Sequence, residues 1–394
     1  LSFDIESMSK TSSAPALELV IEEQRFLAIL QRECSGFCAL ASALLGMSGS
    51  IWNRKHYFQL QIQAESFEAM LDDYGANRNR TFVYLRELVG SLRGFADAGH
   101  SLSHLETRLV TYGLVNTLEL AHYASFEGQI ANVRAFVQDS VVAMLRDLQS
   151  EMTELGAEPH ARDLSDVSFE AVIAQERLPH NVDDEDPYDD GQKIAEVASK
   201  FVLACDMLDQ AGIKPIMDAA LRNAYLSRAC AEEQARVFEA TVHNLQSSYD
   251  THIKSTSLEN QDPRLSQLRG LASAALHTLE AVTALTHFVE RHESEIRSAA
   301  TQTRLARLID RSEVQERTLN RLLVSAALLM ESGRPIAQAI LPQYTDATEL
   351  VVEIPDELML HARPAALIVG IVSKFGTAVE LEVSGQVCNA GSIL

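Results

Sequence analysis

The sequence lacks the cysteine pattern of a disulfide-bonded protein. Its five cysteines form an odd and scattered set: Cys34, Cys38, Cys205, Cys230 and Cys388. Disulfide-rich domains carry regularly spaced, even-numbered cysteines and belong to oxidising compartments. The cysteines therefore predict reduced thiols and a cytosolic protein.

Positive charge is also scarce, since 33 basic residues stand against 55 acidic ones and the net charge is −22. A field of this sign opposes binding to nucleic-acid phosphates and to anionic lipid surfaces. The charge-free run at residues 35–52 is interrupted by glycines and serines, so it is too polar for a membrane span. We expect no nucleic-acid partner, no membrane span, and a buried helix end at 35–52.

Strand-like alternation is missing from residues 15–155. Apolar residues recur there with the spacing of a helix buried on one face, as at Leu85, Leu88, Leu92, Phe95, Leu102 and Leu105. Turn-forming breaks lie at residues 46–53, 72–80 and 111–113. This pattern predicts a helical bundle of roughly four long helices over residues 1–155.

Residues 156–190 differ in composition from the segments on either side. They contain Pro159, Pro179 and Pro187 and end in the acidic run 183–190, where like charges repel and no core can form. We interpret the segment as a solvated linker with one short helix from Ser168. An acidic tail or a metal trap is the alternative.

Helical spacing resumes after the linker, and we predict a second bundle over residues 191–341. The stretch 268–291 aligns with 85–108 without a gap, matching Leu, Arg, Leu, Leu, His and Arg. We favour a duplicated four-helix unit, although two unrelated amphipathic helices would share several leucines. His104 and His287 fall at equivalent positions of the two stretches. They could form a functional pair, but partly exposed or capping histidines near helix ends are favoured.

The helical region is expected to end near residue 341. Gly333 is the predicted C-terminal stop, and Pro335 and Pro342 are the predicted helix breakers. Residues 342–348 would then form a linker to a small module at 349–394. Its pattern predicts a strand, a helix and two strands, at 350–354, 363–374, 377–383 and 386–390. The fold class is mostly α, with two helical bundles followed by this α+β module.

The module contains "LMLHARPAAL", residues 358–367. Pro364 fits the first turn of a helix, so a helix is expected to begin just after His361. Unpaired backbone N–H groups and a positive dipole end favour an anion there. Arg363 adds a guanidinium suited to phosphate oxygens.

The same field disfavours the imidazolium form of His361 and keeps a ring nitrogen available as a nucleophile. The local pattern therefore suits phosphoryl transfer, with His361 as acceptor and Arg363 stabilising the phosphate. The phosphate-binding helix start would include Pro364, Ala365 and Ala366. A histidine that only caps or packs at a loop is the alternative.

The segment from about residue 350 to 394 resembles the first half of HPr, the histidine phosphocarrier family of the bacterial phosphotransferase system. The resemblance rests on the motif L-H-A-R-P-A at residues 360–365, the following S-K-F and the terminal N-A-G-S-I-L. It implies that an Enzyme I-type donor phosphorylates His361 at the expense of phosphoenolpyruvate and that Arg363 holds the phosphate. It also implies that Ser392 occupies the family's regulatory serine position.

Three features depart from the family pattern. Met359 replaces a glycine before the motif, and Gly370 and Ile371 make the helix apolar on nearly all sides. A helix of this kind is normally covered on both faces, so we expect its outer face to dock on the helical region or on a partner. The second half of the domain does not follow Leu394, and we therefore expect a fragment of a longer protein.

These departures leave a second hypothesis open, in which the protein is a helical scaffold whose HPr-like module no longer transfers phosphate. Other motifs are weaker. Glu119 and His122 have the Glu-x-x-His spacing of di-iron bundles but lack a second copy. Cys34 and Cys38 lie one helical turn apart without a second pair to complete a zinc site. We expect no metal and no cofactor, and a phosphoryl carrier rather than a turnover enzyme.

Overall fold

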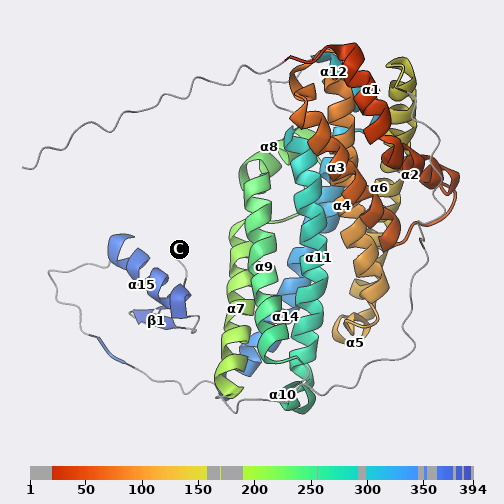
Figure 1. Ribbon diagram of the computed structural model, residues 1–394. Helices are drawn as coiled ribbons and strands as arrows, with labels where there is room; N and C mark the ends of the chain where they lie inside the picture. The colour runs from red at the N-terminus through yellow and green to blue at the C-terminus, as the bar shows by residue number, and fades with distance from the viewer. Residues whose placement is uncertain are drawn as a thin grey trace, which may run out of the picture.

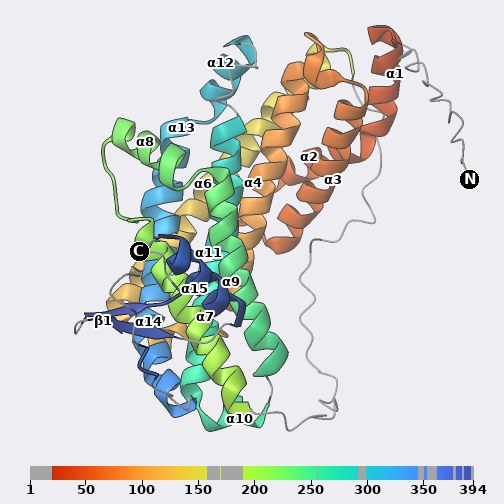
Figure 2. The same ribbon diagram turned by 90° about the vertical axis from the view of Figure 1, so that its left-hand side faces the viewer.

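The computed structural model describes residues 20–157, 169, 190–254, 256–291, 299–344, 350–352, 362–375, 379–383 and 386–391. The chain is mostly α, as its sequence predicts (Figure 1). Long helices run side by side, and their buried apolar residues form one hydrophobic cluster that extends from Phe26 to Ile340. The C-terminal helix and hairpin lie beside this helical body (Figures 1 and 2).

The helices before residue 158 are α1 (Glu23–Glu33), α2 (Ser35–Gly46), α3 (Arg54–Asp73), η1 (Ala76–Arg78), α4 (Val83–Arg108), α5 (Leu114–Thr117) and α6 (Leu120–Glu154). All three predicted breaks are confirmed. Asn53 and His56 form a capping box at the start of α3, while Gly75 and Gly113 adopt left-handed backbone conformations. The first of the expected long helices is instead two helices that meet at Cys34.

The helices after residue 189 are α7 (Asp190–Gln210), α8 (Ala219–Ala229), α9 (Glu232–His252), α10 (Ser257–Gln261), α11 (Pro263–Arg291), α12 (Ala299–Leu308), α13 (Arg311–Glu316), the π-helix η2 (Arg317–Leu323) and α14 (Val324–Tyr344). Helix α11 packs against α4, α9 and α14. The rings of Phe95 on α4 and Phe288 on α11 meet edge to face at 4.9 Å.

Helices α4 and α11, which carry the two similar stretches, run antiparallel. Residues near the end of one lie against the beginning of the other: a side chain at Gly270 would collide with the carbonyl oxygen of Tyr112. Equivalent arginines make equivalent contacts in the two halves. Arg86 donates to Asp72 on α3 at 2.8 Å, and Arg269 donates to Asp250 on α9 at 2.7 Å. These contacts support the duplication, which stays a prediction.

The predicted helix stop at Gly333 is wrong, because α14 continues to Tyr344 with Pro335 and Pro342 inside it. Both prolines are exposed, so water can reach the backbone carbonyls that lose their helical partners. Gly333 packs against α7, where a Cβ atom would lie 2.3 Å from Phe201 Cζ. Tertiary packing therefore overrides the local stop signals.

One residue of the predicted linker, Phe169, is described, and it touches the helical body. Its ring stacks on His56 with centroids 4.4 Å apart, and its carbonyl accepts a hydrogen bond of 2.8 Å from Asn53. The acidic run and the short helix expected from Ser168 lie outside the described residues. The linker segment thus has at least one packed contact at the start of α3.

The C-terminal module contains helix α15 (Ala362–Phe375) and an antiparallel hairpin of β1 (Glu380–Val383) and β2 (Gln386–Asn389). The predicted helix and both of these strands are confirmed. The expected first strand is not: Leu350, Val351 and Val352 form no strand in the part of it that the structure describes, and all three are highly exposed.

Candidate functional site

Helix α15 begins at Ala362, directly after His361 in the chain. His361 and Ser392 lie outside the described residues. Arg363 and Ala366 are exposed, and Pro364 and Ala365 are half-buried. Pro364 is the third residue of the helix and still lies in its first turn, where its missing N–H removes no helical hydrogen bond. The helix start therefore has the position that the motif predicts.

The first turn of α15 can receive an anion. It presents the backbone N–H groups that have no intrahelical acceptor, and its dipole end is positive. Arg363 adds a positively charged guanidinium group within the same turn. Because Pro364 has no N–H, Ala362, Arg363 and Ala365 are the residues of this turn whose amides can donate to an oxyanion.

The apolar outer face of α15 is not covered by the helical body. Leu367 is 64% exposed and Ile371 is 58% exposed, whereas Val372 is buried. Of the two expected docking places, the helical region therefore does not cover this face, and docking on a partner stays a prediction. The helix instead turns Val372 towards the end of the hairpin, where Gly391 approaches it.

The C-terminal segment also matches a known family. Residues 348–394 match the PTS-HPr family, described as the PTS HPr component phosphorylation site. This C-terminal segment is HPr-like. No curated protein and no solved structure matches the chain. The family match covers only this segment and leaves the helical region without a family.

The HPr-like segment contacts the helical body through its hairpin. The side-chain amide of Asn389 on β2 donates a hydrogen bond of 3.2 Å to Asp206 on α7. Asp206 also pairs with Arg334 on α14. Gly391 lies close to the side chain of Leu203, one turn before Asp206. The hairpin end, rather than the apolar face of α15, thus joins the two parts of the molecule.

A polar pocket of about 680 Å³ lies in the helical body between α4, α9 and α11, with Arg54 of α3 at its edge. Most of its lining side chains are charged or are histidines. They include Arg54, Arg93, Asp97, His100, His104, Arg236, Glu239, His277, Glu280 and His287. Perturbed titratable groups in a concave polar site mark candidate binding sites.

A chain of polar contacts lines one end of this pocket. Arg54 Nη1 lies 2.7 Å from His104 Nδ1, and because arginine only donates, this nitrogen of His104 accepts. The ring of His104 meets that of His277 at 4.5 Å. His277 in turn contacts Glu280 at 2.9 Å and the Tyr112 hydroxyl at 3.1 Å. Burial, together with the positive charge of neighbouring groups such as Arg54, lowers the pKa of His104 to about 4, so its ring is neutral.

Carboxylates converge in the middle of the pocket. Burial, and then the charges of Glu280 and Glu239, raise the pKa of Asp97 to about 6. Asp97 accepts a hydrogen bond of 3.1 Å from Gln61. Burial opposes the charge of Glu280, but hydrogen bonds from His277 and Ser101 lower its pKa. This part of the pocket therefore carries negative charge that neighbouring cations do not fully compensate.

A second pocket of about 400 Å³ adjoins the first and shares Arg93, Gly94, His287 and Arg291 with it. Its acidic groups are well compensated. Glu68 pairs with Arg93 at 2.5 Å and with Arg86 at 3.1 Å. His287, at the boundary, lies 2.8 Å from Glu232 on α9. We therefore consider the larger pocket, whose charges are less fully paired, the better candidate.

The histidine pair weighed from the sequence, His104 and His287, lines one pocket. Both side chains are half-buried near a helix end, which agrees with the favoured interpretation of partly exposed histidines, and each faces the groove between packed helices. Sequence reasoning missed His100 and His277, because they have no counterpart in the aligned stretches. Their meeting depends on the antiparallel packing of α4 and α11.

The other sequence motifs form no site. Glu119 and His122 are both strongly exposed and 4.0 Å apart at the start of α6. Cys34 and Cys38 are buried within the core. Among the described residues no cluster of histidine, cysteine and acidic side chains could hold a metal ion. No helix in the described part of the chain is both long and apolar enough for a membrane crossing.

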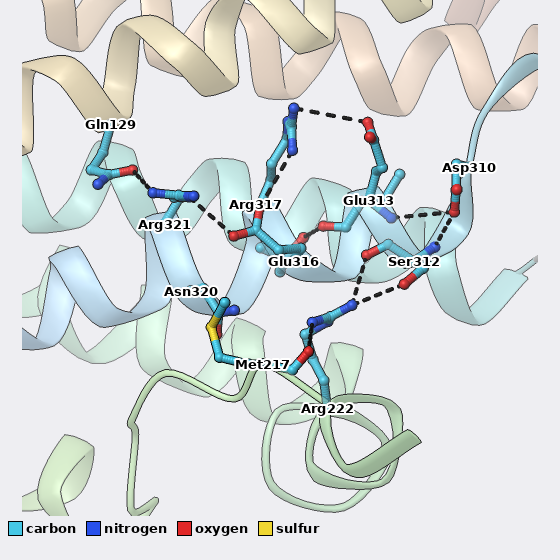
Figure 3. Close-up of polar contacts among 12 residues, drawn as sticks. Gln129, Met217, Arg222, Asp310, Ser312, Glu313, Glu316, Arg317, Asn320 and Arg321 are labelled. Atoms are coloured by element: carbon cyan, nitrogen blue, oxygen red, sulfur yellow. Dashed lines mark hydrogen bonds and ion pairs between the residues drawn. The ribbon is translucent and has the colours of Figure 1, made fainter. Parts of the chain in front are cut away.

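A further polar cluster surrounds the π-helix η2 and joins α8 to α13 (Figure 3). Arg222, which is only 4% exposed, donates to Ser312 Oγ at 2.9 Å and to the carbonyls of Ile216 and Met217 at 3.2 Å. No carboxylate of the described residues pairs with it. Arg321 bridges Glu316 and Gln129. Most of the hydrogen bonds drawn join residues of the cluster to one another, although Nε of Arg222 and Nε of Arg317 have no partner among the described residues. We interpret this cluster as structural.

Proposed function

We propose that the protein is a phosphocarrier, or a regulator controlled by phosphorylation, of a bacterial phosphotransferase system. His361 would accept the phosphoryl group from an Enzyme I-type donor. The observation that carries this proposal is the PTS-HPr match over residues 348–394. The position of His361 immediately before the first turn of α15 supports it.

In the proposed transfer, a neutral ring nitrogen of His361 attacks phosphorus as the bond between phosphorus and the donor breaks. The N–P bond forms, and the negative charge of the phosphoryl oxygens rests against the first-turn amides and Arg363. The helix dipole favours the neutral, nucleophilic imidazole before transfer. Ser392 would be a second, regulatory phosphorylation site.

The helical region would bind an unknown protein partner and report the phosphorylation state of the HPr-like segment. The contact of Asn389 with Asp206 would connect a change at His361 to the helical region, because the hairpin that carries Asn389 follows α15 directly in the chain. The segment itself acts as a carrier that is phosphorylated and dephosphorylated in turn, and it needs no cofactor of its own.

A scaffold without phosphoryl transfer is the second candidate. The exposed apolar residues Leu367 and Ile371 favour it, because such a face suits protein docking. Met359 in place of the family's glycine also favours it. In that case the HPr-like segment would bind partners whether or not His361 is phosphorylated.

The test is incubation of the protein with Enzyme I and radiolabelled phosphoenolpyruvate. We expect an acid-labile label that is absent from His361→Ala and retained in His122→Ala, whose side chain is exposed on α6. Arg363→Gln should slow labelling about 10-fold, because it removes a charged hydrogen-bond donor. The absence of label, under conditions that label an ordinary HPr, would favour the scaffold.

A further inference from the structure

The larger pocket contains polar groups that the protein itself leaves unsatisfied. Thr283 lines it and is 6% exposed, yet its hydroxyl has no hydrogen-bond partner among the described residues. The same holds for Nε2 of His100. Buried polar groups are normally paired, so each such group indicates a missing partner. Both side chains project from the packed pair α4 and α11.

The charges of the pocket are also separated in space. Asp97, Glu239 and Glu280 contribute carboxylates from α4, α9 and α11. A fourth lining carboxylate, Glu232, already pairs with Arg236 and His287. Arg54 stands at one end, beside the neutral ring of His104. The described residues offer Arg54 no carboxylate partner. Asp97 and His104 are about two helical turns apart on α4, roughly 10 Å along its axis.

We propose that this pocket binds a small zwitterion of the amino-acid class, one that carries a protonated amine and a carboxylate. The ammonium group would donate to Asp97 and Glu239, and the hydroxyl of Thr283 and the neutral His100 would accept from it. The carboxylate would lie against the guanidinium of Arg54 and the Nε2–H of His104.

This class fits better than ligands of a single charge. A simple anion would meet the three carboxylates, and a polyamine would meet Arg54 and Arg93. The raised pKa of Asp97 agrees with a missing cation, since a bound ammonium group would compensate the charges of Glu280 and Glu239. The volume of about 680 Å³ is within the range of small-molecule sites.

The test is calorimetric titration of the whole chain with each proteinogenic L-amino acid and with 4-aminobutyrate. The tightest-binding compound is then compared with one analogue that lacks its amine and one that lacks its carboxylate. We expect both analogues to bind at least about 10-fold more weakly, the effect of losing a charged hydrogen bond. Binding of none of these zwitterions, or equal binding of either analogue, would overturn the proposal.

Variants locate the binding in the pocket. Asp97→Asn and Arg54→Gln should each weaken binding about 10-fold or more. Asp73→Asn and Arg78→Gln, exposed residues outside the pocket, should not change it. Unchanged affinity in both pocket variants would place the ligand elsewhere and refute the assignment. The phosphorylation assay on His361 is independent of this result, so the two proposals fail separately.

Discussion

Asp97 on α4 and Glu280 on α11 occupy equivalent positions of the two similar stretches and line the same pocket. Burial of Asp97 and repulsion from Glu280 raise the pKa of Asp97 to about 6. The packing of α4 against α11 thus brings two carboxylates together without a full complement of cations. Groups held in such an unfavourable state usually serve binding rather than stability.

Asp97→Asn should therefore stabilise the protein at neutral pH. A carboxyl group whose pKa rises from 3.8 to about 6 on folding binds more protons in the folded state. Its contribution to stability is consequently lost as the pH rises through this interval. We expect a gain of about 1 to 2 kcal/mol at pH 7.5 and no gain at pH 3.5, measured by urea unfolding. Asp73→Asn is the matched control, and a loss of stability at pH 7.5 would contradict the prediction.

His104 should make the protein sensitive to mild acid. Its pKa falls from 6.5 to about 4 in the folded state, so the unfolded state binds more protons and stability declines as the pH falls below 6.5. His104→Gln keeps an acceptor for Arg54 without a titrating ring. Between pH 7.5 and pH 5 the parent protein should lose roughly 1 kcal/mol more than this variant. His122→Gln, at an exposed site, should behave like the parent protein.

Gly333→Ala should destabilise the protein, because the added methyl group would meet Phe201. Overpacking of this kind costs about 1 to 3 kcal/mol. At Gly128 on α6 a Cβ atom would meet nothing within 4 Å, so Gly128→Ala should stabilise the helix by roughly 0.5 to 1 kcal/mol. Thermal unfolding of the two variants gives the comparison, and a shift in the same direction for both would disprove the packing argument.

Arg222→Ala should cost about 2 to 4 kcal/mol of unfolding free energy. It removes the buried guanidinium that donates to Ser312 and to the carbonyls of Ile216 and Met217, and it opens a cavity. Arg236→Ala is the control, since Arg236 is 61% exposed and makes an ion pair within one helix. Its loss should cost less than about 0.5 kcal/mol of unfolding free energy. Chemical denaturation of both variants measures the difference. Equal costs would show that Arg222 does not hold α8 to α13.

Asn389→Ala should loosen the HPr-like segment from α7. It removes the hydrogen bond to Asp206 and also the acceptor of the Gly391 amide. We expect faster hydrogen exchange at Ala390 and Gly391, with unchanged exchange in α11. Gln386→Ala, at an exposed position of the same strand, should leave exchange at these amides unaltered. If both variants exchange alike, the hairpin does not depend on Asp206.

Local signals predict much of the fold correctly. The breaks near residues 46, 75 and 113 coincide with helix ends, because a cap or a left-handed glycine acts within a few residues of itself. Helix α15 and the hairpin follow their predicted ranges for the same reason. The prediction fails at Gly333, where the contact with Phe201 on a distant helix decides the outcome.

The two candidate sites also differ in how far they could be predicted from the sequence. The motif around His361 and Arg363 can be read from adjacent residues, since a helix start and its anion-binding amides belong to one turn. The pocket cannot, because Arg54, Asp97 and Glu280 come from three helices. The equivalence of His104 and His287 is a weak sequence signal that indicated α4 and α11. It did not indicate which side chains line the pocket beside these histidines.

The helical periodicity, the positions of most turns and the phosphocarrier-like motif follow from the order of residues alone, because each depends on interactions between near neighbours in the chain. The path of α14 through two prolines, and the meeting of carboxylates and histidines from α4 and α11 in one pocket, follow from the packed fold. These outcomes depend on contacts between residues far apart in sequence, whose packing free energy outweighs local preference.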